Sequence, residues 1–239
     1  MFAYRSRLDR VDVAFTDRHG GVSSPPFASL NFGYASGDDA GAVARNVALV
    51  AEALGTDDSH LVSSSQVHGA AVAEVNGTGE KLGRADALVT ARVGVTLCVR
   101  AADCVPVLIA DADAGIVAAA HAGRTGMAAG VVPRVVEATR RLGAARIVAW
   151  VGPHICGRCY EVPEALRDEV SDQVPAAFAT TRWGTPALDL GAGVRSQLKE
   201  HDCDVVEVGR CTFEDSDLFS YRRDGARSGR QAGLISLRS

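Results

Sequence analysis

The stretch Val95–Gly123, VTLCVRAADCVPVLIADADAGIVAAAHAG, decides the fold of this chain. It contains three short apolar or alternating runs, at Val95–Arg100, Val105–Ala110 and Gly115–Ala120, which Asp, Gly or Pro residues bound. Runs of this length between turn-forming residues predict β-strands. Because several of them are apolar throughout, we expect strands that are buried on both faces of a sheet.

The regions on either side of this stretch alternate between strand and helix patterns. Apolar residues at helical spacing predict helices over 40–54, 127–142, 163–174 and 191–201. Further strands are predicted at Val11–Thr16, Leu61–Val67, Ala70–Val75, Ala85–Thr90, Ile147–Val151 and Val205–Val208. The turn-forming residues of Arg18–Pro26 predict a loop, and Pro175–Pro186 reads as a surface loop. The mixture favours one α/β or α+β domain over residues 1–239, with central sheet layers covered by helices.

Composition narrows the class of protein. Of 239 residues, 25 are Lys or Arg and 29 are Asp or Glu, which leaves a net charge of −4. A mildly acidic, evenly mixed chain does not attract nucleic acid or anionic lipid over its whole surface. The longest apolar stretches are far too short to span a bilayer, and Met1–Arg5 lacks the pattern of a signal peptide. We therefore expect a cytoplasmic protein whose six cysteines are thiols or metal ligands rather than a disulfide framework.

Three residues stand where an apolar strand turns into a loop. His68 lies in SQVHG, Cys104 in ADCVP and His121 in AAAHAG. Strand ends are where layered α/β folds usually build ligand sites. Two imidazoles and a thiolate suit zinc, with a fourth position left for water or substrate. The neighbours Asp103 and Gln66 are placed to act behind these ligands.

The spacing of this trio, 36 and then 17 residues, matches no short zinc motif, so the pattern alone leaves alternatives open. The plainest is two ordinary histidines and a buried thiol. Another is a metal-free nucleophile, with Cys104 activated by a histidine that Asp103 or the second histidine orients.

Other cysteines and histidines give weaker signals. Cys156-Gly157-Arg158-Cys159 is a CxxC without a second CxxC, and such isolated pairs are mostly structural or incidental. We interpret Cys98, Cys203 and Cys211 as thiols that lie in the core or have no functional role. His19 lies in a Gly-rich loop, where it is more typical of a loop-fixing residue than of a metal ligand.

Several arginines fall in predicted loops or beside the histidine motifs, among them Arg18, Arg124, Arg222 and Arg230. Guanidinium groups next to the free N–H groups of Gly-rich turns are what a phosphate or carboxylate site needs. The alternative for any one of these arginines is an ordinary solvated surface residue. The sequence has no GxxxxGK[ST] and no GxGxxG, so it gives no support to nucleoside-triphosphate or dinucleotide binding.

At these residues the chain resembles a known family, the bacterial laccase-domain proteins called multicopper polyphenol oxidases and now regarded as purine nucleoside phosphorylases. The match is ordered across nearly the whole chain, which makes it specific. The matching segments are Arg18–Ser23, Leu30–Gly33, Ser65–Gly69, Ala85–Thr90, Ala102–Pro106, His121–Gly123, Gly152–Pro153, Cys159–Val162, Asp189–Leu190, Phe219–Arg223 and Gly229–Arg230. Members often carry Trp after His-Ala-Gly, whereas this chain has Arg124.

The resemblance implies a single domain that forms a four-layer α/β/β/α sandwich. It also implies a metal ion, zinc or alternatively copper, bound by His68, Cys104 and His121. It also implies phosphorolysis of adenosine, inosine and S-methyl-5'-thioadenosine, with some adenosine deamination, by a monomer or homodimer. The partners are then small purine nucleosides and phosphate. On this reading the catalytic residues are Cys104, Asp103, His68 and His121, and those that bind substrate or phosphate are Arg18, His19, Asn31, Gln66, Arg124 and Arg222.

The histidine count bears on the chemistry. A multicopper oxidase needs many histidines, typically in closely spaced pairs, and this chain has six His and no His-x-His. One redox-inert zinc ion with an open position instead suits attack by water, hydroxide or phosphate. The alternatives are a metal-free Cys–His hydrolase acting on peptidoglycan precursors, a polyphenol oxidase with bound copper, and a non-catalytic binding module.

Overall fold

The computed structural model describes residues 1–238, and its first sheet joins the two ends of the chain. Five strands lie in the order β1 (Phe2–Leu8), β2 (Val11–Thr16), β13 (Gln231–Leu237), β6 (Thr96–Ala101) and β3 (Leu61–Val62). The pairings are antiparallel, except that β3 runs parallel to β6. The last strand therefore lies in the middle of a sheet that the first two strands begin.

The second sheet is built around the stretch that opens the sequence argument. Six strands lie in the order β12 (Asp204–Glu207), β9 (Val148–Val151), β7 (Val105–Asp111), β8 (Ile116–Ala122), β5 (Ala87–Thr90) and β4 (Val72–Glu74). β7 pairs antiparallel with both β8 and β9, whereas β12 and β4 pair parallel with their neighbours. All seven residues of β7 and of β8 are buried, which confirms the prediction of strands covered on both faces.

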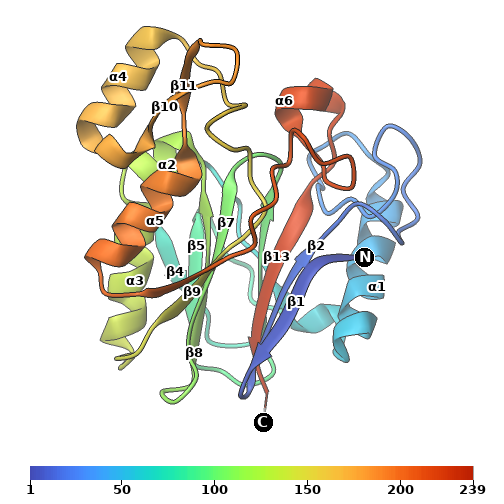
Figure 1. Ribbon diagram of the computed structural model, residues 1–239. Helices are drawn as coiled ribbons and strands as arrows, with labels where there is room; N and C mark the ends of the chain where they lie inside the picture. Colours follow the sequence, from blue (N-terminus) through green and yellow to red (C-terminus); the bar gives the residue numbers. More distant parts are fainter. Residues whose placement is uncertain (239) are drawn as a thin grey trace.

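Helices cover the outer faces of the two sheets. Helix α1 (Ala40–Leu54) lies against the five-stranded sheet, and the helices that cover the six-stranded sheet lie on the opposite side of the molecule (Figure 1). These are α2 (Arg124–Ala128), α3 (Val131–Arg141) and α5 (Leu190–Glu200), while α4 (Glu164–Gln173) packs against the segment Pro175–Leu188. The short elements η1 (Asp58–His60), η2 (Pro175–Ala177), α6 (Tyr221–Asp224) and η3 (Gly225–Arg227) complete the helical part.

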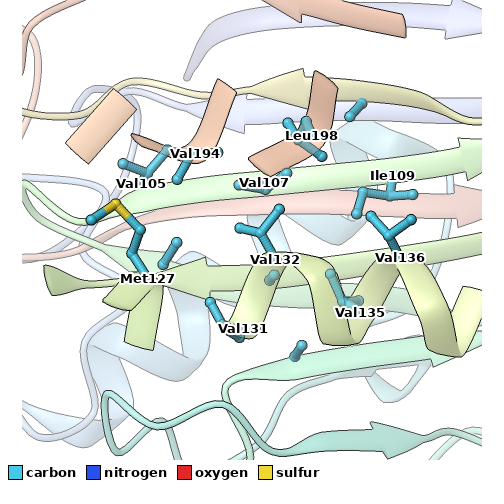
Figure 2. Close-up of a cluster of buried hydrophobic side chains, with 14 of the residues drawn as sticks. Val105, Val107, Ile109, Met127, Val131, Val132, Val135, Val136, Val194 and Leu198 are labelled. Atoms are coloured by element: carbon cyan, nitrogen blue, oxygen red, sulfur yellow. The ribbon is translucent and has the colours of Figure 1, made fainter. Parts of the chain in front are cut away.

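Three hydrophobic cores fill the space between these sheets and helices, and β7 contributes side chains to two of them. Its residues Val105, Val107 and Ile109 pack toward α3 and α5, as Figure 2 shows, while Leu108 and Ala110 belong to the core between the two sheets. A third core joins α1 to the five-stranded sheet. The result is an α/β domain with two mixed sheets plus helices, as the sequence predicted at this level.

The helix predicted over 40–54 has the same bounds as α1, whereas the other predicted helices differ more from the structure. The helix expected over 127–142 is two helices, α2 and α3, because Gly130 between them adopts a left-handed φ of +80°. The helices expected over 163–174 and 191–201 correspond to α4 and α5.

Other boundaries and elements differ from the predictions. The strand expected at Leu61–Val67 ends at Val62; beyond it Ser65 forms only an isolated bridge with Arg84, and the amide of Val67 bonds to the Asp86 carboxylate. The supposed loop Pro175–Pro186 holds η2 and a hairpin of β10 (Phe178–Thr180) with β11 (Pro186–Leu188). The sequence patterns missed β1 and β13 altogether. Among the described residues, no helix combines the length and the apolar character needed to cross a membrane.

Candidate metal centre and active site

His68, Cys104 and His121 converge in space although they are far apart in the chain. His68 lies in the loop after β3, Cys104 between β6 and β7, and His121 in β8. Their ligand atoms all lie within 4.8 Å of one another, and Cys104 Sγ is 3.8 Å from His68 Nε2. The two imidazoles meet edge to face, with ring centroids 4.8 Å apart. The structure thus brings the three predicted ligands to one point.

Gly123 leaves the room that this convergence needs. A Cβ at this position would lie 2.6 Å from His68 Cδ2, closer than real Cβ atoms approach, and 3.1 Å from Cys104 Sγ, which is an unusually tight contact. Gly123 follows β8 and caps the start of α2, so it is fixed in place by both elements. The glycine of the His-Ala-Gly motif is therefore part of the cluster's packing.

Asp86, to which the sequence reasoning gave no role, holds two of the three donors. Its side chain is fully buried, and Oδ1 lies 2.9 Å from His121 Nδ1. The same carboxylate accepts the backbone N–H groups of Val67, His68 and Gly69. A carboxylate on Nδ1 directs the other imidazole nitrogen, Nε2, toward the cluster. The sequence feature that could have pointed to Asp86 is an acidic residue directly before a strand of wholly buried residues, Ala87–Thr90.

The electrostatics favour a charged thiolate beside a charged imidazole. Burial by itself would raise the pKa of Cys104, but the positive charge of His121 and hydrogen bonds from both imidazoles lower that pKa to about 6. For His121 the effect of burial has the opposite sign and would lower its pKa, but the Cys104 thiolate and the Asp86 carboxylate raise that pKa to about 9. Cys104 is therefore ready to act as a nucleophile or as a metal ligand near neutral pH.

The donor set fits a zinc ion. Tetrahedral zinc with bonds of about 2.0–2.3 Å to nitrogen and sulfur sets its ligand atoms about 3.3–3.8 Å apart. The distance of 3.8 Å between Cys104 Sγ and His68 Nε2 agrees with this. Three protein ligands would leave a fourth position open toward the adjoining pocket, as in catalytic sites.

A pocket of about 830 Å³ opens over the cluster. Its lining combines aromatic and cationic side chains, and includes Tyr34, Arg100, Arg124, Tyr160, Tyr221, Arg222 and Arg230. The Arg222 guanidinium lies 4.8 Å from the centre of the Tyr160 ring. Among residues 1–238, none of these four arginines forms an ion pair with a carboxylate. The pocket thus offers positive charge to an anion together with ring faces to a flat base.

Gln66 and Asp103 line the pocket and also fix its arginines. Gln66 donates to the Arg100 carbonyl at 2.7 Å and accepts the Arg100 backbone N–H at 2.9 Å. Asp103 accepts the Thr212 hydroxyl at 2.6 Å through Oδ1 and the Arg222 backbone N–H through Oδ2. Both oxygens of Asp103 are therefore engaged in holding the loops that carry Thr212 and Arg222.

Two other sequence candidates lie outside the described lining of this pocket. Arg18 donates from Nε to the Ala28 carbonyl and stacks over the Phe219 ring. His19 is half-exposed and lies 2.9 Å from Asp217 at the surface. Their observed contacts are those of loop-fixing residues.

Asn31 reaches the pocket only through its neighbours. It is fully buried and donates to Ser36 and Asp38, while its Oδ1 accepts the backbone N–H groups of Gly33 and Arg230. Gly33 and Arg230 line the pocket, so Asn31 shapes a wall that it does not itself form.

The structure also shows a second group of potential metal ligands, which the sequence did not predict as a group. Cys156, Cys159, Cys211 and Glu214 also place their ligand atoms within 4.8 Å of one another. Burial and the neighbouring thiols raise the pKa of Cys156 and of Cys159, in contrast to Cys104. The CxxC had no visible partner because Cys211 and Glu214 lie more than fifty residues further along the chain.

Comparison with known proteins agrees with this geometry. The family model described as multi-copper polyphenol oxidoreductase laccase matches residues 12–238. A purine nucleoside phosphorylase of Streptomyces coelicolor is 52% identical, over 99% of this chain and 100% of that protein. One from Mycobacterium tuberculosis is 47% identical, over 95% of this chain and 92% of that protein.

Solved structures extend the similarity to the fold. YlmD from Geobacillus stearothermophilus superposes with a TM-score of 0.88 at 33% identity, covering 97% of this chain and 93% of that one. The YfiH protein of Bacillus licheniformis gives 0.88 at 32% identity, covering 96% and 94%. With this match over nearly its whole length, the chain belongs to the multi-copper polyphenol oxidoreductase laccase family, as its histidine and cysteine motifs predicted.

Proposed function

We propose that this protein is a zinc-dependent purine nucleoside phosphorylase for adenosine, inosine and S-methyl-5'-thioadenosine, with adenosine deamination as a side activity. One observation carries the proposal: the pocket sets arginines without carboxylate partners and tyrosine rings around the cluster of His68, Cys104 and His121. The names of the relatives support it, since those from S. coelicolor and M. tuberculosis are called purine nucleoside phosphorylases.

The pocket provides for both substrates of a phosphorolysis. Arg100, Arg124, Arg222 and Arg230 would bind inorganic phosphate, because guanidinium groups match phosphate oxygens in charge and geometry. The tyrosine rings would stack on the purine and hold its sugar toward the phosphate. A phosphate oxygen then attacks C1′, the C1′–N9 bond breaks, and the purine leaves with the electron pair and takes up a proton. Nucleoside and phosphate give free base and ribose 1-phosphate.

Zinc bound by His68, Cys104 and His121 would supply a Lewis acid that stabilises developing negative charge. The chain's own groups prepare this site: Asp86 fixes the tautomer of His121, and Gln66 fixes Arg100. Asp103 fixes the backbone at Arg222 and so acts as a positioning residue. Copper is the alternative ion for the same donors.

The test is a product assay with purified, metal-replete protein. Adenosine with phosphate is expected to give adenine and ribose 1-phosphate, and no adenine when phosphate is omitted. Inosine formed from adenosine reports the deamination. The Cys104→Ala variant should lose both activities, while Cys203→Ser, which changes a buried thiol outside the pocket, should keep them. No product from the metal-replete enzyme would contradict the proposal.

A metal-free Cys–His hydrolase, acting on peptidoglycan precursors, is a second candidate that one observation favours. Asp86, His121 and Cys104 stand in the order acid, imidazole and thiol, and the pKa of Cys104 is lowered to about 6. Such an enzyme keeps its activity after chelation and loses it to iodoacetamide. The zinc-dependent enzyme loses activity on chelation and regains it with zinc.

A polyphenol oxidase with several coppers fits this chain poorly. Beyond His68 and His121, the other four histidines have separate surroundings: His19 faces Asp217, His60 ends η1, His154 faces the Gly152 carbonyl and His201 the Gln197 carbonyl. We further propose that residues 1–239 form one domain with α/β/β/α layers. This domain would work as a monomer or homodimer in the cytoplasm, where its thiols stay reduced.

A further inference from the structure

The second donor cluster lies where two loops meet beside the pocket. Cys156 and Cys159 follow β9, and Cys211 and Glu214 follow β12. Their ligand atoms lie within 4.8 Å of one another, and Cys159 Sγ is 3.5 Å from Glu214 Oε1. None of the four belongs to the cluster of His68, Cys104 and His121. Their grouping therefore needs its own explanation.

Local backbone structure aims the three sulfurs at one point. Cys156 and Cys159 form a turn, in which the Cys156 carbonyl accepts the Cys159 N–H at 2.9 Å. Gly157 lets this turn approach the N-terminus of α5, because a Cβ there would lie 2.6 Å from the Cβ of the N-cap residue Asp189. The backbone N–H of Cys156 donates to Cys211 Sγ at 3.4 Å.

The second loop is tied to the first by backbone bonds. His154 and Cys211 form an isolated bridge, with His154 N–H donating to the Arg210 carbonyl and Thr212 N–H donating to the His154 carbonyl. Cys211 is thus held opposite the turn before any side chain is considered. The cluster is preorganised by the fold rather than by chance contact of flexible side chains.

The distances and charges suit a closed zinc site. Sulfur and oxygen ligands of tetrahedral zinc lie about 3.5 Å apart, given bonds of about 2.3 and 2.0 Å. The Cys159–Glu214 separation of 3.5 Å matches that value. Three thiolates are soft donors that select zinc over magnesium or calcium. The Arg182 guanidinium, 2.6 Å from Glu214 Oε1, would offset part of the remaining negative charge.

We propose that Cys156, Cys159, Cys211 and Glu214 bind a second, structural zinc ion that clamps the two loops together. Binding releases the three thiol protons to solvent and leaves zinc with four protein ligands and no open position. The clamp acts on the pocket through neighbours of its ligands. Thr212 donates to Asp103, and Tyr160 lines the pocket next to Cys159.

The competing chemistry for these thiols is a disulfide between two of them. Loss of two thiol hydrogens requires an oxidant, and a disulfide would leave the third thiol and Glu214 without a shared partner. Zinc uses all four donors at once. This difference separates the two readings experimentally.

The test counts zinc in two variant backgrounds. His68→Ala/Cys104→Ala, which removes donors of the first site, is expected to retain about one equivalent of zinc per chain after purification without added metal. Adding Cys159→Ser should remove that equivalent, whereas adding Cys203→Ser, a buried thiol outside both clusters, should not. Because Cys159 is buried and its variant can fail to fold, Glu214→Gln at the half-exposed ligand provides a milder change. It should weaken zinc retention while the protein stays folded.

Two further readouts decide the outcome. Cobalt added to the metal-free His68→Ala/Cys104→Ala protein should give the intense sulfur-to-cobalt absorption of a tetrahedral thiolate site, and Cys159→Ser should abolish it. Chelation should lower the melting temperature of the same double variant but not of its Cys159→Ser derivative. No zinc in the double variant, or a Cys156–Cys159 disulfide in freshly purified protein, would overturn the proposal.

Discussion

At the scale of single residues, the site is organised by a side chain that touches no substrate. Asp86 lies fully buried behind His121 and gathers the amides of the His68 loop. One carboxylate therefore sets both the direction of an imidazole and the path of the loop that brings the second imidazole. Its effects on metal affinity and on local structure are consequently linked.

Replacing this carboxylate gives the first prediction. Asp86→Asn keeps the size of the side chain but loses the charge that orients His121, so zinc affinity should fall by about 10–100-fold. The measurement is a zinc competition titration with a chromophoric chelator. Asp113→Asn, at an exposed surface ion pair with Arg146, serves as the control and should leave affinity unchanged. Equal affinities for all three proteins would show that Asp86 plays no part.

The thiol of Cys104 gives the second prediction. In metal-free protein its pKa of about 6 keeps it ionised down to that pH, so its alkylation by iodoacetamide should rise with pH, centred near 6, and level off above. Cys98 has a pKa raised to about 11 by burial and should stay unlabelled across that range. Mass spectrometry of the labelled peptides measures both rates. In His121→Ala the midpoint should move upward, since the positive neighbour is gone; an unchanged midpoint would contradict this account.

The residue scale also marks what the sequence can and cannot reveal. His68, Cys104 and His121 stood out because each is a strong ligand at the end of an apolar strand. Asp86 did not, because its role depends on amides that turn toward it only in the folded loop. Asn31 was chosen from a motif, yet its amide acts on the backbone of Gly33 and Arg230.

At the scale of elements, Gly130 divides what the periodicity presents as one helix. Residues 127–142 keep an apolar face throughout, which predicts one helix, although Gly130 and Pro133 within the segment are helix-breaking residues. The left-handed φ of +80° at Gly130 ends α2 and lets α3 start in a new direction across the six-stranded sheet. Arg124 and Thr125 of α2 can then line the pocket while α3 packs in the core.

This break gives the third prediction. Gly130→Ala forces a Cβ into the left-handed region and should reduce the free energy of unfolding by about 1 kcal/mol. For a chain of this size that corresponds to a melting temperature about 2–4 °C lower, measurable by calorimetry. Gly77→Ala, at a glycine with open space around its Cβ position, is the control. A stabilised Gly130→Ala protein would show that the backbone there relaxes without strain.

The strands β1 and β13 were missed because their local sequence patterns are weak. β1 mixes arginines with apolar residues along Phe2–Leu8, so it lacks a clear alternation, and β13 follows a segment rich in Gly and Arg. Each becomes a strand because β2 offers it a partner on one side. Partner choice of this kind is invisible in a local window.

At the scale of the whole molecule, two sheets pressed face to face carry the structure. The core between them draws on strands from both ends of the chain, with Val13 and Ile235 from the five-stranded sheet and Leu108 and Trp150 from the other. The sequence predicted the α/β class from its alternating elements. It could not give the strand order, since that depends on which distant strands pair.

The fourth prediction concerns this central core. Ile235→Ala leaves a cavity between the sheets and should cost about 2–5 kcal/mol of unfolding free energy in denaturant titration. Ser236→Ala, in the same strand but partly exposed, should change stability by less than about 0.5 kcal/mol. If both variants behave alike, the inter-sheet core is not where the stability resides.

The position of β13 between β2 and β6 also governs how the protein is made. A nascent chain carries β1, β2 and β6 long before Gln231–Leu237 leaves the ribosome. Until then β2 and β6 each present an open hydrogen-bonding edge, and one face of the inter-sheet core has a missing strand. The five-stranded sheet can therefore close only after synthesis has passed β13, and until then the edges of β2 and β6 are exposed to pairing with other chains.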